Sequence, residues 1–125
     1  MSTRVNYLTT EQDFALEVAC ATLEAAGLNV YLVGSVLTRA DWRDVDLRCI
    51  DLDGHLKFIT ESRVLKRLLN AAMSAWLRER TGLPIDFQFQ DMAEANKYDG
   101  KRTARGILIE CEAAQDQAAR QNDKG

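Results

Sequence analysis

The chain has 125 residues, of which 46% are hydrophobic and 28% charged, and its formal net charge is −3 at pH 7. This length allows one domain with one core, and the slight acidity excludes a protein that coats nucleic acid through a basic surface. No apolar run reaches the roughly 20 residues of a membrane span, and the N-terminal segment lacks the apolar stretch of a secretion signal. We therefore expect a cytoplasmic protein without a membrane partner. The three cysteines are widely spaced, which predicts neither a disulfide framework nor a zinc site.

The first predicted element is a helix over residues 10–26. Thr10 is followed by acidic residues, which favour the positive end of a helix dipole. Apolar side chains then recur at helical spacing, at Phe14, Val18, Ala21 and Ala25. Gly27 is placed to end this helix. Residues 29–33 are β-branched and aromatic, which predicts a buried strand that stops at Gly34.

Two more strands and the longest helix follow. Residues 44–51 alternate as a strand does, with one face formed by Asp44, Asp46 and Arg48. Residues 61–80 predict a helix with the apolar stripe Val64, Leu65, Leu68, Leu69, Ala72, Met73 and Trp76. Residues 85–90 alternate again, and their polar face carries Asp86, Gln88 and Gln90.

The remaining segments carry weaker patterns. Residues 92–96 predict a helical turn, 97–105 a basic loop, and 107–109 either a last strand or the start of a helix. The polar residues 113–125 predict a C-terminal tail that is helical or disordered. The order helix, strand, strand, helix, strand predicts an α/β (α+β) domain over residues 1–112, with a mixed sheet of about 3–5 strands flanked by helices.

Aspartates occupy strand positions where aspartate is disfavoured, because its side chain competes for backbone hydrogen bonds. Asp44 and Asp46 share the face of one strand, and Asp86 lies on the polar face of another. If these strands are neighbours, the carboxylates repel one another and raise each other's pKa unless a cation lies among them. Mg²⁺ (or Mn²⁺) suits such a site because it prefers oxygen ligands and leaves positions for substrate phosphates. The alternative is a solvated strand face, which alternates in the same way.

Gly34 and Ser35 follow the first predicted strand and begin a predicted short helix that runs through Thr38. Free backbone N–H groups at a helix start bind anions. Glycine lets the backbone approach a phosphate closely, and the serine hydroxyl adds a donor. Only eight residues separate Ser35 from Asp44, so a phosphate site here would lie beside the carboxylates. The alternative interpretation is a simple turn.

This ordered set resembles the signature of the nucleotidyltransferases related to DNA polymerase beta. That signature is a hydrophobic strand ending in Gly-Ser, a short helix and loop, an Asp-hydrophobic-Asp strand and an acidic residue on a later strand. The corresponding pieces here are Leu32–Ser35, Asp44–Leu47 and Ile85–Phe87, within about residues 28–90. The segments GSVLTRADWRDVDLR and RTGLPIDFQFQDMAEANKYDG also resemble small nucleotidyltransferase-like proteins of bacteria and their phages.

The resemblance implies a role for each of these residues. Asp44 and Asp46 would bind metal, with Asp46 bridging two ions, and Asp86 would bind the second ion and orient the attacking hydroxyl. Gly34 and Ser35 would hold the β- and γ-phosphates of a nucleoside triphosphate. The implied reaction is in-line attack on the α-phosphorus with release of pyrophosphate.

Several other positions stay open at this stage. Many family members carry an arginine three places after the serine, but that place is Thr38 here and Arg39 comes one later, so Arg39 is not assigned a role. Arg48 either meets a phosphate or neutralises the carboxylates, and Gln88 either contacts the nucleotide or is solvated. Trp42 either stacks on a base or anchors its loop. The basic loop closes over a substrate or is solvated.

The sequence leaves three functions open. The first is a metal-dependent enzyme that transfers a nucleoside monophosphate to a hydroxyl of a protein, an RNA or a small molecule. The second is an antitoxin or other partner-binding protein of this fold, which could act by modifying its partner. The partner expected of the chain is another protein or a second copy of itself in a homo-oligomer. The third is a nucleotide sensor or degenerate binding module without catalysis. The three aspartates count against it, because a pure interaction domain has no physical need for three converging negative charges.

Overall fold

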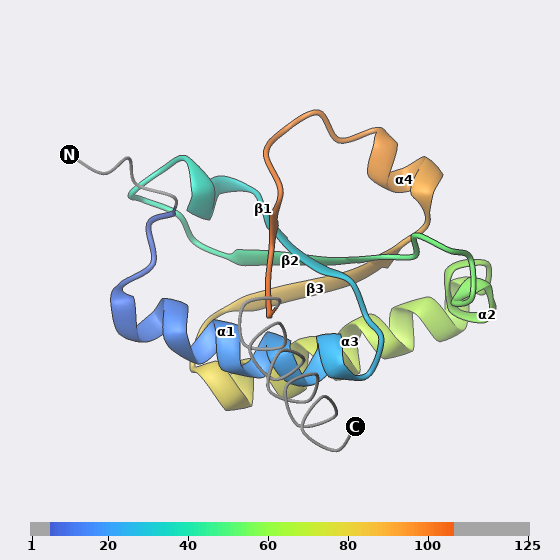
Figure 1. Cartoon of the computed structure of the whole chain (residues 1–125), viewed down its shortest axis with the longest axis horizontal. Coiled ribbons are helices and arrows are strands. Elements are labelled where there is room, and N and C mark those ends of the chain that lie inside the picture. The colour runs from blue at the N-terminus through green and yellow to red at the C-terminus, as the bar shows by residue number, and fades with distance from the viewer. Residues whose placement is uncertain (1–5, 107–125) are drawn as a thin grey trace, which may run out of the picture.

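The computed structural model describes residues 6–106, which form a four-stranded mixed sheet flanked by helices (Figure 1). The elements in chain order are α1 (Thr10–Ala25), β1 (Val30–Val33), the 3₁₀ helix η1 (Ser35–Leu37), β2 (Val45–Ile50), α2 (Lys57–Thr60), α3 (Arg63–Thr81), β3 (Ile85–Gln90), α4 (Met92–Asn96) and β4 (Thr103–Ala104). The predicted fold class is therefore confirmed. The segments predicted at 107–109 and 113–125, and the domain boundary at 112, lie outside the described residues.

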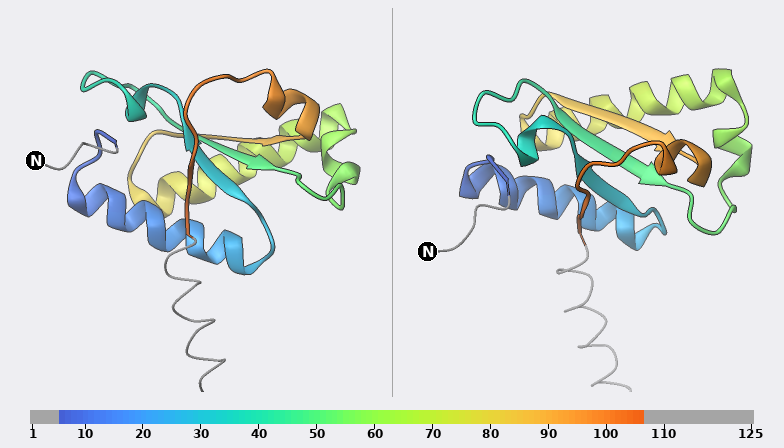
Figure 2. Two further views of the ribbon diagram at one scale, coloured as in Figure 1. Left: turned by 45° about the horizontal axis from the view of Figure 1, so that its top comes forward. Right: turned by 90° about the horizontal axis from the view of Figure 1, so that it is seen from above.

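The strands lie in the order β3-β2-β1-β4, with β2 antiparallel to β1 and parallel to β3. The two long helices α1 and α3 cover one face of the sheet, and α4 lies on the other side (Figures 1 and 2). The main core fills the space beneath the sheet and contains Leu32, Leu47 and Phe87, one residue from each of the three longer strands. No helix among residues 6–106 is long and apolar enough to cross a membrane.

The register fixes which side chains share the open face of the sheet. Asp46 is the partner of Val33 on β1 and of Asp86 on β3. One pair further along the strands, Arg48 is the partner of Gln88 on β3. The predicted polar faces of the two strands are thus side by side, although β2 begins at Val45 rather than at Asp44. The ladder begins there because the Val45 N–H donates to the Pro84 carbonyl at 2.9 Å.

Helix α1 starts at a capping box, in which the Thr9 hydroxyl accepts from the Gln12 N–H and the Gln12 side chain accepts from the Thr9 N–H. Its buried residues are Leu16, Ala19, Cys20 and Leu23. The helical spacing of Phe14, Val18, Ala21 and Ala25 predicted the helix correctly. It did not predict which face is buried, since Phe14 is 66% and Val18 45% exposed. The helix is apolar on two sides, and only one of them packs against the sheet.

Helix α3 runs alongside the edge strand β3 (Figure 2). Its side chains form hydrogen bonds with the free edge of that strand. The Phe89 N–H donates to the Asn70 amide oxygen at 2.8 Å, and the Phe87 N–H donates to the Ser74 hydroxyl at 2.9 Å. One helical turn further on, Arg78 Nε donates to the Ile85 carbonyl at 2.9 Å. Side chains four residues apart on a helix lie in one row, so they match every second residue of the strand. An unpaired sheet edge is thereby avoided.

This arrangement explains why part of the predicted apolar stripe of α3 is exposed. Leu65, Leu69, Met73 and Trp76 pack against the core as predicted. Val64 and Leu68 instead are exposed to solvent, because the helix turns the polar row that contains Ser74 toward β3.

The predicted basic loop contains an additional short strand, β4, and a structural arginine. Arg105 is only 6% exposed, and it forms ion pairs with Asp13 at 2.8 Å and Glu17 at 3.0 Å on α1. The next residue, Gly106, packs so closely on α1 that a Cβ atom would stand 2.6 Å from the Cys20 carbonyl oxygen. Arg105 therefore ties β4 to α1 and is not a solvated loop cation.

Candidate functional site

Gly34 joins β1 to η1 in a backbone conformation that suits only glycine. Its φ is 84° and its ψ −160°, a region that residues with a side chain rarely adopt. A Cβ atom here would stand 2.3 Å from Oδ2 of Asp46. The glycine therefore permits both the turn and the close approach of backbone to carboxylate.

Asp46 and Asp86 are register partners on parallel strands, and Arg48 lies between their carboxylates. The Arg48 guanidinium is 3.9 Å from Asp46 Oδ1 and 3.5 Å from Asp86 Oδ2. It also donates to the main-chain carbonyls of Leu47 and Asp86, each at 2.9 Å. Of the two roles open for Arg48 at the sequence level, the geometry favours neutralisation of the carboxylates.

Burial raises the pKa of the Asp46 carboxyl, and the negative charges of Asp86 and Asp44 raise it further. Arg48 opposes both effects without cancelling them. The charged form of Asp46 is therefore disfavoured, mainly because it is partly removed from solvent, and a bound cation would stabilise that form.

A cleft of about 370 Å³ opens beside Asp46 and is lined by Ser35, Arg39, Asp41, Arg43, Asp44 and Asp46. Arg39 forms an ion pair with Asp41 at 2.9 Å, whereas Arg43 has no ion pair with the described residues. The cleft brings together Ser35 of the Gly-Ser turn, both aspartates of the Asp-Val-Asp segment and two exposed arginines.

Asp46 also lines a second cavity of about 250 Å³, together with Gly34, Arg48 and Gln88 from the sheet and Tyr98 and Arg102 from the loop after α4. The Gly34 N–H donates to the Tyr98 hydroxyl at 3.3 Å. The Arg102 guanidinium lies over the Tyr98 ring, 5.4 Å from its centroid. Tyr98 and Arg102 belong to the basic loop over residues 97–105, for which the sequence left two roles open: closing over a substrate, or lying in solvent. In the structure this loop contacts the turn at Gly34.

Trp42 anchors the loop before β2. Its Nε1 donates to the Tyr7 carbonyl at 3.1 Å, and its ring packs against the core. The same loop contributes Arg43 and Asp44 to the lining of the cleft. By anchoring the loop, Trp42 therefore fixes the position of these two residues. Of the two sequence-level roles for Trp42, the structure favours the structural one.

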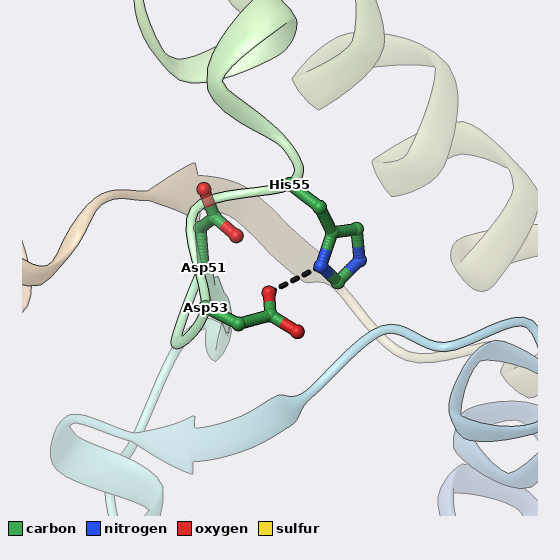
Figure 3. A group of neighbouring side chains, drawn as sticks. All are labelled: Asp51, Asp53 and His55. Atoms are coloured by element: carbon green, nitrogen blue, oxygen red, sulfur yellow. Dashed lines mark ion pairs between the residues drawn. The ribbon is translucent and has the colours of Figure 1, made fainter.

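The donor atoms of Asp44, Asp46 and Asp86 are all carboxylate oxygens, which is the chemistry that Mg²⁺ requires. Within residues 6–106, however, one group of three potential ligands has its donor atoms within 4.8 Å of one another, and it consists of Asp51, Asp53 and His55 (Figure 3). Asp44 and Asp46 line the same cleft, while Asp86 is held on the neighbouring strand by Arg48. Asp44, Asp46 and Asp86 thus suit a divalent ion by the chemistry of their donor atoms, but among residues 6–106 they do not form a group of three with all donor atoms within 4.8 Å of one another.

The Asp51–Asp53–His55 group lies on the turn after β2, roughly 16 Å along the strand from Asp46. Asp51 is only 5% exposed, and its carboxylate accepts from the N–H groups of Gly54 and Leu56 at 3.1 and 3.2 Å. His55 Nδ1 contacts a carboxylate oxygen of Asp53. This group could hold a metal ion, and Asp51 independently closes the turn. Sequence analysis missed it because Asp53 and Gly54 indicate only a turn.

Comparison of the chain with models of protein families, with curated proteins and with solved structures gives no match.

Proposed function

We propose that this protein is a metal-dependent nucleotidyltransferase of the DNA-polymerase-beta-like kind. It would move a nucleoside monophosphate from a nucleoside triphosphate to a hydroxyl acceptor and release pyrophosphate. The observation that carries the proposal is the contact of the Gly34 backbone with the Asp46 carboxylate, beside Asp86 on the adjacent strand. Because glycine lets the turn lie close to the half-buried Asp46 carboxylate, a phosphate bound at the turn and a cation bound at the carboxylate would be neighbours.

In this proposal the triphosphate lies in the cleft beside Asp46. The Ser35 hydroxyl donates a hydrogen bond to a phosphate oxygen, and Arg43, which has no ion pair with the described residues, supplies positive charge. Asp44 and Asp46 hold Mg²⁺ or Mn²⁺. When bound, the ion neutralises the charge on the phosphate oxygens.

In this proposal Asp86 acts on the hydroxyl group of the acceptor. Its carboxylate orients the attacking hydroxyl and takes its proton, while Arg48 holds the carboxylate in place from the neighbouring strand. The acceptor oxygen forms a bond to the α-phosphorus, and the bond from that phosphorus to the bridging oxygen of pyrophosphate breaks. This chemistry suits a protein, an RNA or a small molecule with a free hydroxyl.

The experiment is transfer of label from each of the four α-labelled triphosphates, with Mg²⁺ or Mn²⁺ and a cell lysate as the source of acceptors. We expect Asp86→Asn to reduce transfer by orders of magnitude and leave triphosphate binding nearly unchanged. Ser35→Ala should weaken binding by roughly tenfold at most, since one neutral hydrogen bond contributes about 0.5–1.5 kcal/mol.

Asp53→Asn is the matched control, because it removes a carboxylate from the other metal-capable group. It should leave transfer unchanged. Transfer that survives Asp86→Asn but is lost in Asp53→Asn would contradict the assignment. Absence of transfer with every triphosphate, metal and lysate would contradict the enzyme itself.

A partner-binding protein of the same fold is the second candidate, and one observation favours it. Phe14 and Val18 on α1 are exposed. They line a cavity of about 330 Å³ with Trp76 and Arg80 of α3. Exposed apolar surface of this kind is typical of protein interaction sites. Affinity capture with wild type and with a Phe14→Ser, Val18→Ser variant tests it, and equal capture by both would contradict it.

A further inference from the structure

The turn between β2 and α2 carries three potential metal ligands. The carboxylates of Asp51 and Asp53 and the imidazole of His55 point toward one another (Figure 3), and their donor atoms all lie within 4.8 Å of one another. A Zn²⁺ ion with ligand bonds of about 2.0–2.2 Å holds its ligand atoms roughly 3–4 Å apart. The side chains of Asp53 and His55 are exposed, so rotation of these two is enough to bring the donor atoms to that separation.

The burial of Asp51 points independently to a cation. Asp51 is only 5% exposed, and it is the one buried carboxylate among residues 6–106. Arg105, the other buried charged residue of that range, has two carboxylate partners, whereas Asp51 has no ion pair with the described residues. The groups that donate to it are the neutral N–H groups of Gly54 and Leu56. Buried charges in proteins are paired or coordinate metals, so a cation beside Asp51 would supply the positive charge that its burial requires.

The mixed donor set selects the class of ion. A site made of carboxylate oxygens suits Mg²⁺, the ion proposed at Asp44 and Asp46. The imidazole nitrogen of His55 instead suits Zn²⁺ and other divalent transition metal ions. Three protein ligands leave a position for water on a four-coordinate ion, and the exposure of Asp53 and His55 gives solvent access to it.

The Asp51–Asp53–His55 group is separate from the proposed site of nucleotide transfer. It begins just after Ile50 at the end of β2, roughly 16 Å along the strand from Asp46. The same turn leads into α2, where Leu56 and Ile59 are part of the core. An ion that joins the residues of this turn would therefore hold the connection between the sheet and α2.

We propose that Asp51, Asp53 and His55 form a binding site for Zn²⁺ or a divalent transition metal ion of similar ligand preference. The neutral imidazole and the two carboxylates bind the ion, and the backbone hydrogen bonds of Asp51 hold its carboxylate in position beforehand. The bound ion stabilises the turn between β2 and α2 and takes no part in nucleotide transfer. The proposal is independent of the proposed function, because it uses none of the same residues.

The test uses the fact that His55 is the only histidine of the chain, so the NMR signals of its imidazole ring report on this site alone. The untagged protein is titrated with Zn²⁺ in the absence of triphosphate. We expect the imidazole signals to shift and to saturate, and the melting temperature to rise with Zn²⁺ concentration. Mg²⁺ at the same concentrations should leave the imidazole signals unchanged, because it prefers oxygen ligands.

Two variants remove one exposed ligand each. Asp53→Asn should weaken the Zn²⁺ response of the imidazole signals by at least roughly 10–100-fold in affinity, which is the usual effect of losing even a partner of a ligand. His55→Gln should abolish the increase in melting temperature at Zn²⁺ concentrations that saturate wild type. Asp51 is left unchanged, because it also closes the turn through its hydrogen bonds. Asp46→Asn is the matched control, since it removes one carboxylate elsewhere and should keep the full response of His55.

Imidazole signals that do not respond to Zn²⁺ overturn the proposal and leave an ion pair between His55 and Asp53. An equal response in Asp53→Asn and wild type also overturns it, because His55 would then bind the ion without the carboxylates. Loss of the response in Asp46→Asn overturns it by placing the ion at the cleft. The readout needs no triphosphate, so failure of the transfer experiment leaves this site standing, and failure here leaves the proposed transfer unaffected.

Discussion

The backbone of Gly34 lies against the carboxylate of Asp46, with 2.3 Å between Asp46 Oδ2 and the position that a Cβ atom would occupy. The two residues belong to adjacent strands, β1 and β2, that run antiparallel. Any side chain at position 34 must push the Asp46 carboxylate aside or shift the turn. The contact thus links the shape of the turn at Gly34 to the position of the Asp46 carboxylate, which we propose as a metal ligand.

Gly34→Ala should destabilise the fold by about 1–3 kcal/mol, because alanine is strained at this φ and ψ. It should also abolish the increase in melting temperature that Mg²⁺ with a triphosphate gives wild type. Gly82→Ala is the matched control, since Gly82 has a φ of 71° with nothing within 4 Å of a Cβ atom. It should lose a similar stability and keep the ligand effect. Urea denaturation and thermal melts measure both, and a full ligand effect in Gly34→Ala would contradict the assignment.

The alternation of apolar and polar residues along β2 and β3 predicted that Asp46 and Asp86 lie on the polar faces of their strands. Asp46 and Asp86 each stand between apolar residues, so their direction follows from the strand period of two. Their exact pairing depends on the parallel register of β2 and β3, which the sequence does not encode locally. The resemblance supplied that adjacency, and the structure agrees with it.

Contacts between distant segments could not be predicted from local patterns. The Tyr98 hydroxyl meets the Gly34 N–H across 64 residues, and Arg105 meets Asp13 on α1. Neither pairing leaves a periodic signal. The exposed side of α1 was misassigned for a related reason, because Phe14 and Leu16 belong to two apolar stripes and only tertiary packing selects between them.

Asp46→Asn should stabilise the protein at neutral pH in the absence of metal. The native pKa of Asp46 is raised above its usual value, so the folded state binds this proton more tightly than the unfolded state does. Stability contributed by this group is therefore present at low pH and is lost as pH rises through the raised pKa. The gain from Asp46→Asn should disappear as pH falls below the unfolded value of about 3.8.

Urea denaturation at a series of pH values measures this effect. Asp99→Asn, in the exposed loop after α4, is the control for a change of net charge alone. Metal-dependent stabilisation of wild type should weaken over the same acidic range, because protonated Asp46 is a poor ligand. An Asp46→Asn variant that is less stable than wild type at neutral pH would show that the carboxylate is structural.

Cys20 and Cys49 should resist alkylation in the folded protein. Burial raises the pKa of each thiol to about 12, so almost no thiolate is present at mildly alkaline pH. A Cys111→Ser variant leaves these two as the protein's remaining cysteines. Mass spectrometry after iodoacetamide treatment should show no adduct in native protein and two in guanidinium chloride. Rapid native labelling of either thiol would contradict the buried positions.

Ser74→Ala should remove a hydrogen bond that α3 makes to the edge of the sheet. The Ser74 hydroxyl accepts from the Phe87 N–H at 2.9 Å in a buried position. Alanine leaves this N–H without a partner among the described residues, which costs about 1–3 kcal/mol. The higher helix propensity of alanine offsets at most about 0.7 kcal/mol of that loss. We therefore expect a net decrease in the free energy of unfolding.

Hydrogen exchange distinguishes this local effect from a general loss of stability. The Phe87 amide should exchange faster in Ser74→Ala, while the Phe89 amide, which donates to Asn70, should change only as much as global stability does. Ala72→Ser on the exposed side of α3 controls for helix propensity and should leave both amides protected. Uniform acceleration of the two amides would show that Ser74 contributes through packing of α3. Unchanged stability would show that the Phe87 N–H finds another partner, and the row from Asn70 to Arg78 would then not be what closes the edge.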